Sequence, residues 1–597
     1  MLFGVYSSPV LFLRRLVVFI AIACAVIFAV SSLRWPLVGD ASLMHYVVFL
    51  AERGLTPYRE IADINLPGTY AAGWLAMHLF GDGPLAWRLY DLVLGLTAAI
   101  AMAVIAWPYD RLAGIFAGAL FVLIHGRDGM AELGQRDLLM TVLLLWAVAL
   151  TLCALRRRRL FFIPLAGALA GFAFTIKPPA VLFWIATLGF VALLQKPRKK
   201  SPILPSGGSA ELQSLGENSA NHPSKRQRRD LYQPGAQPQV SARPETQRAE
   251  SPLYRLLLLT HTPQFRAFLP APADALHSEN PLKPSQLLHN GIWPLLIVPA
   301  IALAFIIHGH ALRPFWFITT RLIPLHNSLL RFPNSYFLLH LLPATLIPIS
   351  LLCLLALFMR KRAGMDIFNE TEVLLALNAL CGLLSFYVQR KALPYHRYPA
   401  DAFLVLLISL IFFRSLKDAK ASKALRISGA TGLLFAALIL APQSLLRTFR
   451  VKSNPNGFSK LLQEDLSHLG GASLDRNVQC IDFTAGCVTT LYRMKIEQST
   501  GFLYDCYALQ QDTNPVVRQY REEFWNALVG RKPRVIVLTN QDCGHDDSFD
   551  KLSRWPQLDS FIEHRYSLYK QVTPPDKVRW TGKAEPPYSY RIYVLRS

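Results

Sequence analysis

The sequence predicts a polytopic α-helical membrane protein that ends in a small extracytoplasmic α/β domain. Three observations support this fold class. Hydrophobic residues make up 52% of the 597 residues and charged residues only 17%, a composition unlike that of a soluble globular protein. Apolar runs of membrane-spanning length recur along the chain. Lys and Arg form short clusters between these runs, as is typical of cytoplasmic loops, so the net charge of +23 does not indicate nucleic-acid binding.

The first apolar run, residues 16–34, fixes the orientation of the others. It follows Arg14 and Arg15, which places the N-terminus in the cytoplasm. It contains "AVS" at 29–31, which has the small residues of a signal-peptide cleavage site. Because the run is longer than the core of a signal peptide, we expect it to be retained as the first membrane span.

Counting from this run predicts about eleven transmembrane helices and a C-terminus outside the cytoplasm. The basic clusters "RRRR" at 156–159 and "RKR" at 360–362 then fall inside, in agreement with the positive-inside rule. The expected spans are 16–34, 86–106, 112–125, 138–155, 160–176, 179–194, 292–308, 336–358, 371–388, 399–415 and 427–446.

Composition divides the chain into four regions. Residues 1–195 form an N-terminal transmembrane module with a first outer loop at 35–84. Residues 196–288 are rich in Ser, Pro, Gln and basic residues, which predicts a disordered basic cytoplasmic insertion. Residues 289–446 contain the C-terminal transmembrane helices, and residues 447–597 form the extracytoplasmic (periplasmic) α/β domain.

The C-terminal region carries the strand signals and half of the cysteines. "RVIVLTN" at 534–540 is a β-like run, and "YRIYVLR" near the end alternates apolar and polar residues. Cys480, Cys487, Cys506 and Cys543 all lie here, where oxidising conditions permit disulfides. Four cysteines allow three pairings, and the sequence does not choose among them.

The short outer loops carry more charge than membrane topology explains. Basic residues on this face oppose the positive-inside rule, so another constraint is expected to hold them there. The charged residues and histidine of interest are Asp40, Asp63, Arg127, Asp128, Glu132, Arg136, Asp137, Lys177, Lys391, His396 and Arg397.

Converging acids and bases at a membrane boundary fit a site for an anionic, lipid-linked substrate. Transfer of a sugar from a polyprenyl phosphate requires a base that deprotonates the acceptor hydroxyl and cations that stabilise the leaving phosphate. Asp40 follows the first span, close to where the lipid tail would hold the phosphate. Arg and Lys side chains can clamp the phosphate oxygens.

Each of these residues also has a purely structural interpretation. Asp40 fits the N-cap of a helix starting at "DASLMHYV", and Asp137 fits the cap of the fourth span. Arg136 fits an interfacial anchor and His396 a surface histidine. Lys177, which precedes a proline, fits a turn.

The order of these segments resembles the start of bacterial GT-C glycosyltransferases, which include relatives of protein mannosyltransferases and of the enzymes that add aminoarabinose to lipid A. The resemblance is carried by "GDASLMHYVVFLAERGLTPYREIADINLPGTYAAGWLAMHLFG", by "AWRLYDLVLG" and by "QRKALPYHRYP". It implies that Asp40 is the catalytic carboxylate and that an acidic site lies in "DGMAELGQRD". It also implies a polyprenyl-phosphate-sugar donor, inversion at the anomeric carbon, and neither a metal nor another cofactor.

We therefore expect an integral glycosyltransferase of the bacterial inner (plasma) membrane, with residues 1–195 as its catalytic module. Its partners would be membrane lipids, a polyprenyl-phosphate sugar and a glycan, lipid or protein acceptor. An oligosaccharide ligase with a lipid-diphosphate donor, or a non-catalytic transporter or envelope-polymer-binding protein, remain alternatives. The expected catalytic residues are Asp40, Asp128, Glu132 and Asp137, and the expected substrate- and phosphate-binding residues are Asp63, Arg136, Lys177, Gln389, Lys391, Tyr395, His396 and Arg397.

Overall fold

The structure is a computed structural model that describes residues 8–194, 283–329, 332–418, 420–449, 457–543, 545–575 and 588–596. Most of the predicted insertion at 196–288, namely residues 196–282, lies outside the described residues. Its predicted end is too late, because α11 begins at Pro284.

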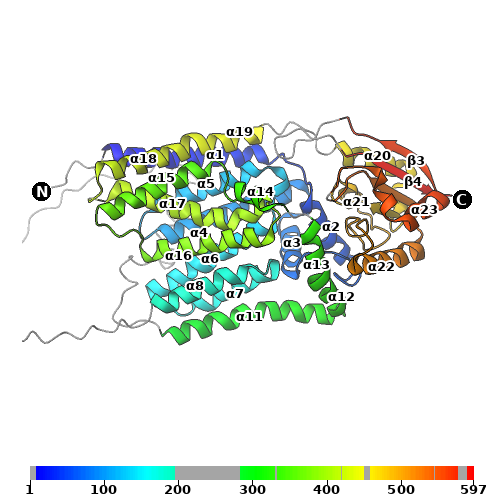
Figure 1. Cartoon of the computed structure of the whole chain (residues 1–597), viewed down its shortest axis with the longest axis horizontal. Coiled ribbons are helices and arrows are strands. Elements are labelled where there is room, and N and C mark those ends of the chain that lie inside the picture. The colour runs from blue at the N-terminus through cyan, green and yellow to red at the C-terminus, as the bar shows by residue number, and fades with distance from the viewer. Residues whose placement is uncertain are drawn as a thin grey trace, which may run out of the picture. The chain divides into compact units, whose positions relative to one another are not determined.

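A bundle of long helices forms the membrane part of the chain (Figure 1). Each of the eleven predicted apolar runs corresponds to helical structure. The helices are α1 (Ser8–Ser32), α4 (Pro84–Ala106), α5 (Arg111–Asp128), α6 (Arg136–Arg157), α7 (Phe162–Ile176), α8 (Ala180–Leu194), α11 (Pro284–His308), α15 (Leu346–Arg362), α16 (Glu370–Gln389), α17 (Tyr398–Lys417), α18 (Lys423–Phe435) and α19 (Ala441–Phe449).

Within the described residues, seven helical segments are long and apolar enough to cross a membrane. Helices α7 and α8 are apolar but shorter. The multi-pass helical fold is thus confirmed, whereas the count of eleven spans stays a prediction. The seven segments are Pro9–Ser32, Pro84–Ala106, Arg136–Arg157, Pro284–His308, Glu370–Gln389, Pro394–Lys417 and Lys423–Leu446.

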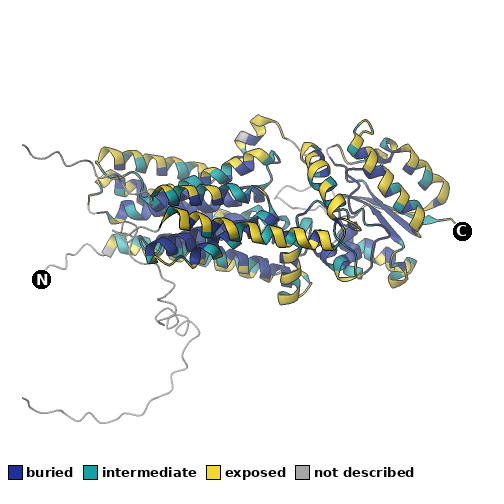
Figure 2. Ribbon diagram, turned by 90° about the horizontal axis from the view of Figure 1, so that it is seen from below, coloured by how far each residue is buried: buried dark blue, intermediate teal, exposed yellow. Residues whose placement is uncertain are grey.

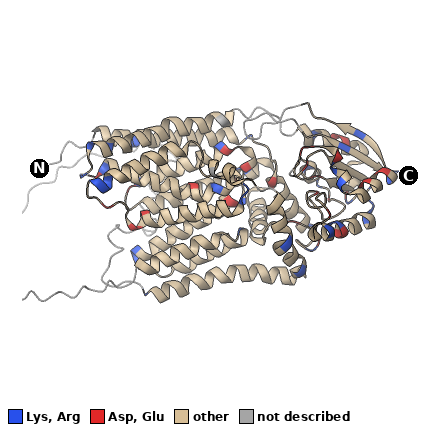
Figure 3. Cartoon of the chain, in the orientation of Figure 1, with Lys and Arg blue, Asp and Glu red and all other residues tan. Residues whose placement is uncertain are grey.

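Burial differs between the centre and the edge of the bundle. The apolar windows of α6 and of Pro394–Lys417 are 89% buried, whereas those of α1 and α11 are 17% and 11% buried. Helices at the edge expose large apolar side chains such as Phe19 and Ile301, which is the arrangement that lipid favours. Figure 3 shows long stretches of helix surface without charge between charged ends.

Small residues allow close helix packing in two places. A Cβ atom on Gly167 would lie 2.5 Å from the carbonyl oxygen of Gly291, so α7 and α11 approach each other backbone to backbone. A Cβ atom on Gly118 of α5 would lie 2.5 Å from Ala99 of α4. Glycines spaced four apart, at 114 and 118 and at 167 and 171, are typical of such interfaces.

One predicted span is interrupted. The run 336–358 contains α14 (Asn334–Leu339) and, after a break, α15, which begins at Leu346. Pro343 lies in the break. Because proline lacks an N–H group and clashes with the preceding turn, the helix does not continue through it.

The first outer loop contains two helices, α2 (Asp40–Glu52) and α3 (Pro67–Phe80). Two further short helices, α12 (Leu312–Phe317) and α13 (Ile323–Leu329), are joined by a π-helical turn. These elements lie at the end of the bundle that contacts the C-terminal domain (Figure 1).

The C-terminal domain is a small α/β fold, as predicted. Its sheet has the order β1-β2-β4-β3, with β1 and β2 parallel and the other pairs antiparallel. Both strand predictions are confirmed, because "RVIVLTN" contains β2 and "YRIYVLR" contains β4. Strands β1 and β2 are buried under the helices (Figure 2). The elements are α20 (Gly457–Leu469), β1 (Val478–Ile481), α21 (Cys487–Met494), α22 (Pro515–Arg531), β2 (Val535–Thr539), α23 (Pro556–Arg565), β3 (Tyr566–Val572) and β4 (Tyr590–Leu595).

The cysteines of this domain form two disulfides. Cys480 pairs with Cys487, and Cys506 pairs with Cys543. This is one of the three pairings that the sequence left open.

Polar contacts join the domain to the first outer loop. Ser42 of α2 and Thr489 of α21 share a hydrogen bond of 2.7 Å between their hydroxyl oxygens. Arg53, which follows α2, forms an ion pair of 2.8 Å with Asp475. The C-terminal domain therefore packs on the loop that carries Asp40.

Candidate active site

A cavity of about 390 Å³ lies where the first outer loop, the ends of the bundle helices and the C-terminal domain meet. Five of the residues predicted for the site line it together: Asp40, Glu132, Arg136, Lys391 and Tyr395. They come from parts of the chain separated by as many as 355 positions, and the fold brings them to one place.

Asp40 is the first residue of α2 and is partly buried. The N-cap of this helix is Gly39, with φ 58° and ψ −137°, and no side chain caps the helix. The N-cap interpretation of Asp40 is therefore wrong: glycine takes the cap because it tolerates positive φ without strain. The Asp40 carboxylate instead accepts a hydrogen bond of 3.4 Å from Gln135 Nε2, another residue of the cavity wall.

Arg136 and Lys391 supply positive charge to the cavity. The Nε atom of Arg136 is buried without a hydrogen-bond partner among the described residues, so the guanidinium group has unused donor capacity. Lys391 is 8% exposed. Burial, followed by the positive charges of Arg136 and Lys177, lowers the pKa of Lys391 to about 7, although Asp40 and Asp137 act in the opposite direction. An anion in the cavity would relieve this repulsion.

Lys177 and Asp137 form a buried pair that does not line the cavity. Lys177 Nζ lies 2.7 Å from Asp137 Oδ2 and donates a hydrogen bond of 2.9 Å to Gln389 Oε1. Burial lowers the pKa of Lys177 to about 8, and Asp137 opposes this shift. Its ammonium group also lies 5.5 Å from the centre of the Tyr395 ring. Three predicted site residues therefore support the wall behind Tyr395.

Glu132 lines the cavity and is buried. The residue is 7% exposed. Burial raises its pKa well above the usual range, and the nearby carboxylates of Asp128, Asp40 and Asp137 raise it further. The side chain therefore holds its proton more readily than an ordinary carboxyl group does, which makes Glu132 a poor candidate for the base.

Arg397 is directed towards acids rather than towards the cavity. Its guanidinium group lies 3.8 Å from Asp128 and 3.9 Å from Asp401, and it donates to the carbonyl oxygen of His340 at 3.1 Å. His396, 3% exposed, packs edge-on against Tyr395, with ring centres 4.5 Å apart. None of these residues except Tyr395 lines the cavity.

Asp63 also lies behind the wall. It is 1% exposed and accepts hydrogen bonds from the hydroxyl groups of Tyr70 at 2.6 Å and Tyr504 at 2.8 Å. The Asn65 amide donates to the same carboxylate at 2.9 Å. Since Asn65 and Tyr504 line the cavity, Asp63 ties the outer loop to the C-terminal domain at its edge.

Sequence reasoning missed the contribution of the C-terminal domain. Phe483, Thr484, Tyr504, Gln541 and Tyr588 line the cavity. They are ordinary polar and aromatic residues in loops, and only their shared position in the fold sets them apart.

His326 of α13 was missed too, although it lies in an outer loop. It is 8% exposed and lines the cavity, and its Nδ1 lies 3.1 Å from the Tyr507 hydroxyl. Burial, then the charges of Lys391 and Arg136, lowers the pKa of His326 to about 2. The imidazole is therefore neutral.

The sequence also gave no indication of a buried network of polar residues below the site. Asp91 of α4 lies 2.8 Å from His125 Nε2 and accepts the backbone N–H of Gly134 at 2.7 Å. His125 Nδ1 lies 2.9 Å from the Tyr398 hydroxyl. This network holds the segment that leads into Gln135 and Arg136. Among the residues that the structure describes, no group of three or more His, Cys, Asp or Glu side chains is placed to hold a metal ion.

Comparison with known proteins identifies part of the chain. Residues 67–208 match the family model described as "Dolichyl-phosphate-mannose-protein mannosyltransferase". This segment includes Glu132, Arg136 and Lys177 but neither Asp40 nor Lys391. No curated protein matches the sequence significantly.

Solved structures resemble the chain over most of its length. The crystal structure of ArnT from Cupriavidus metallidurans bound to undecaprenyl phosphate has 12% identity and a TM-score of 0.49, covering 97% of this chain and 98% of that chain. The oligosaccharyltransferase AglB from Archaeoglobus fulgidus, in complex with an inhibitory peptide and a dolichol-phosphate, has 10% identity and a TM-score of 0.48, covering 94% and 74%. At this level of similarity neither structure supports the transfer of a residue role. The family-model match confirms the resemblance to GT-C glycosyltransferases, and the chain is a multi-pass membrane protein whose residues 67–208 are similar to the protein mannosyltransferase family.

Proposed function

We propose that this protein is an integral membrane glycosyltransferase that moves a sugar from a polyprenyl-phosphate donor to an extracytoplasmic acceptor, with Asp40 as the general base. The observation that carries the proposal is the shared cavity, which is lined by the acids Asp40 and Glu132 and by the basic residues Arg136 and Lys391. The matched family is described by a dolichyl-phosphate-mannose donor, which belongs to the same chemical class.

The proposed reaction uses each of these groups. Asp40 takes the proton from an acceptor hydroxyl as that oxygen forms a bond to the anomeric carbon of the donor sugar. The bond between the anomeric carbon and the phosphate oxygen breaks, and its electron pair leaves with the lipid phosphate. Arg136 and Lys391 stabilise the negative charge that develops there. Attack from the face opposite the leaving phosphate inverts the anomeric centre.

The supporting residues have positioning roles in this proposal. Lys177, held by Asp137 and Gln389, fixes the Tyr395 wall and adds positive potential. Protonated Glu132 donates a hydrogen bond to the acceptor or to Asp40. In this account the enzyme lies in the bacterial inner membrane, with a cytoplasmic N-terminus and a periplasmic C-terminal domain.

The test compares wild-type protein with Asp40→Asn in membranes that contain a radiolabelled lipid-linked sugar. Removal of a general base costs about 10²–10⁴-fold in rate, so transfer should fall by that factor. Glu52→Gln is the matched control, because Glu52 is an exposed carboxylate at the other end of the same helix. Unchanged transfer by a well-folded Asp40→Asn variant would overturn the assignment.

The released lipid separates the two enzymatic alternatives. A polyprenyl-phosphate donor leaves a lipid monophosphate, whereas an oligosaccharide ligase leaves a lipid diphosphate. Recovery of the diphosphate would favour the ligase. Movement of an intact lipid-linked sugar across the membrane, without transfer to an acceptor, would favour the transporter.

A further inference from the structure

The part of the cavity wall that comes from the C-terminal domain differs chemically from the part that comes from the membrane bundle. The bundle contributes the cations Arg136 and Lys391. The C-terminal domain contributes, among its described residues, the uncharged side chains Phe483, Thr484, Tyr504, Gln541 and Tyr588, which we call the roof. A neutral surface of hydroxyl, amide and aromatic groups suits a polyol better than a phosphate.

We propose that Thr484 and Gln541 form a subsite that hydrogen-bonds the hydroxyl groups of a sugar ring and thereby helps to select the sugar. This inference rests on the proposed function and deepens it, since it assigns the sugar-recognising part of the same cavity.

Thr484 and Gln541 bond to each other and still have hydrogen-bond donors and an acceptor for a sugar hydroxyl. Gln541 Oε1 accepts the backbone N–H of Thr484 at 2.7 Å, and Gln541 Nε2 donates to Thr484 Oγ1 at 3.1 Å. A glutamine amide has two donors and two acceptor lone pairs, and a threonine hydroxyl has its own donor. Among the described residues, one amide N–H, one carbonyl lone pair and the Thr484 O–H therefore remain for a ligand. A sugar hydroxyl, which both donates and accepts, matches this mixed set.

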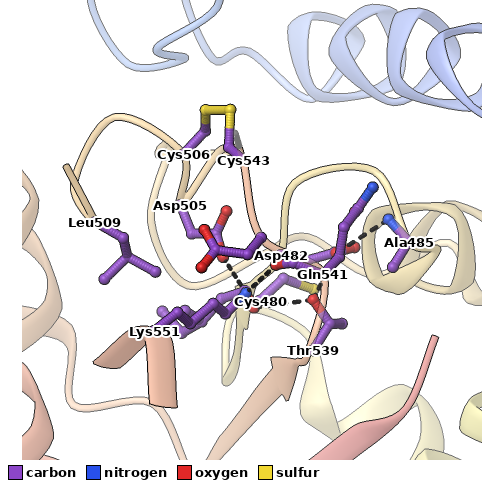
Figure 4. A network of polar contacts seen from close by, with 12 residues as sticks. Cys480, Asp482, Ala485, Asp505, Cys506, Leu509, Thr539, Gln541, Cys543 and Lys551 are labelled. Atoms are coloured by element: carbon purple, nitrogen blue, oxygen red, sulfur yellow. Dashed lines mark hydrogen bonds and ion pairs between the residues drawn. A yellow bond between two sulfur atoms is a disulfide. The ribbon is translucent and has the colours of Figure 1, made fainter. Parts of the chain in front are cut away.

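Disulfides and polar contacts fix the loops of both residues, and Figure 4 shows Gln541 among these contacts. Thr484 lies in the loop closed by the Cys480–Cys487 disulfide, and Gln541 lies two positions from Cys543 of the other disulfide. In the first loop, Asp482 accepts the backbone N–H groups of Ala485 at 3.0 Å, Gly486 at 3.1 Å and Cys487 at 2.9 Å.

The loop of Gln541 is anchored by a buried ion pair. Lys551 Nζ donates to the Gln541 carbonyl oxygen at 2.7 Å and pairs with Asp505. The side chains of this pair are 0% and 2% exposed. A third link is the hydrogen bond of 2.9 Å from Thr539 Oγ1 to Asp482. Polar groups that are fixed before binding lose little entropy on binding, and they discriminate strongly because a wrong ligand leaves them unpaired.

Aromatic residues complete the roof. Phe483 and Tyr504 lie with ring centres 5.9 Å apart at an angle of 49°. The C–H face of a sugar ring can pack on such a surface while its hydroxyl groups reach the amide.

The experiment measures binding to the purified full-length protein in lipid nanodiscs, so it does not depend on turnover. The probes are decaprenyl phosphate and the same lipid phosphate carrying glucose, mannose or galactose. The variants are Thr484→Val, which keeps the shape and removes the hydroxyl, Thr484→Ser, which restores it, and Gln541→Ala. Gln510→Ala is the matched control, because Gln510 bonds the backbone of Cys506 at 2.9 Å in the same region without lining the cavity.

We expect wild-type protein to bind at least one sugar-carrying lipid more tightly than bare lipid phosphate. Loss of one hydrogen bond corresponds to about a tenfold weakening, so Thr484→Val and Gln541→Ala should weaken that lipid about tenfold and leave bare lipid phosphate within about twofold. Thr484→Ser and Gln510→Ala should behave as wild type. If the recognised ring belongs to a glycan acceptor, the same variants should instead raise the KM for that acceptor about tenfold at unchanged donor affinity.

Two outcomes overturn the inference in distinguishable ways. In the first, Thr484→Val and Gln541→Ala change neither the donor affinity nor the acceptor KM, or no sugar-carrying lipid binds more tightly than bare lipid phosphate and the acceptor KM is the same in every variant. The roof then does not recognise sugars, and the proposed function stands. If wild-type protein fails to bind even bare lipid phosphate, the proposed function falls, and the subsite falls with it.

Discussion

The affinity of the cavity for a lipid phosphate should depend on pH through Lys391. Burial, Arg136 and Lys177 lower the pKa of Lys391 to about 7 in the empty cavity, against an ordinary value of about 10.4. A bound phosphate favours the charged ammonium and raises the pKa, so binding takes up a proton wherever Lys391 is neutral beforehand. Affinity is therefore greatest below pH 7 and is lost as pH rises.

The magnitude follows from the pKa. With a free-site pKa of about 7, the dissociation constant should rise about fivefold between pH 7 and 8 and about tenfold between pH 8 and 9. The loss levels off once pH passes the pKa that Lys391 has beside the bound phosphate.

The assay is equilibrium binding of decaprenyl-phosphate glucose to protein in nanodiscs between pH 6 and 9. The phosphodiester of this lipid keeps a single negative charge over the whole pH range. Any change of the dissociation constant with pH therefore comes from the protein. Lys391→Arg, whose guanidinium group stays charged, should bind with a clearly smaller pH dependence, which leaves only the contribution of Lys177, whose pKa is about 8. Lys391→Met should bind weakly at every pH.

The reasoning would be refuted by a dissociation constant that is constant between pH 7 and 9 in the wild-type protein, or by an equal slope in Lys391→Arg. Either result would mean that Lys391 does not exchange a proton on binding.

Three further predictions concern the residues around the cavity. Lys177→Met should lower the free energy of unfolding by about 3–5 kcal/mol, because it leaves the Asp137 charge buried and unpaired. Thermal unfolding measures this loss, and adding Asp137→Asn to the Lys177→Met variant should recover most of it. Asp63→Asn replaces a charged acceptor of the Tyr504 hydroxyl by a neutral one and weakens this hydrogen bond by about 1–1.5 kcal/mol, so hydrogen exchange should speed up in residues 500–505 and remain unchanged in α6. Glu132→Gln should keep transfer within about tenfold of wild type, because the role proposed for Glu132 requires only an uncharged hydrogen-bond donor. A loss as large as that expected for Asp40→Asn would show that Glu132 acts in its ionised form.

The helices of this protein could be predicted well from the sequence because the lipid environment fixes composition and length. Apolar runs such as 138–155 and 399–415 correspond to α6 and α17. The run 336–358 is the instructive exception, since hydropathy continues through Pro343 whereas the backbone does not. The alternation of apolar residues likewise marks β4, because one face of that strand is buried.

The site was only partly predictable, and the reason is tertiary. The predicted topology marks Arg136 and Lys391 as unusual, because it disfavours basic residues on outer loops, and Asp40 is marked by its place directly after the first span. The charge pattern of the loops does not distinguish residues that line the cavity from residues that lie behind its wall. Lys177 and Asp63 carry the same signal but serve as supports, because each finds a buried partner that only folding brings near.

The residues from the C-terminal domain gave no signal at all. Thr484 and Gln541 are 57 positions apart in loops of ordinary composition, and their pairing depends on the register of β1 and β2 and on which cysteines join. Local sequence rules do not contain this information. The assignment of Asp40 as an N-cap failed for a local reason, since the preceding glycine satisfies the backbone conformation that the cap requires.

The single-turnover rate of Asp40→Asn at saturating lipid-linked sugar, with donor affinity measured on the same preparation, tests the central claim most directly. If Asp40 is the general base, the rate should fall about 10²–10⁴-fold while the dissociation constant of the donor stays within about twofold of wild type. An unchanged single-turnover rate, or a loss that donor binding alone accounts for, would contradict the role of Asp40 as the base for sugar transfer.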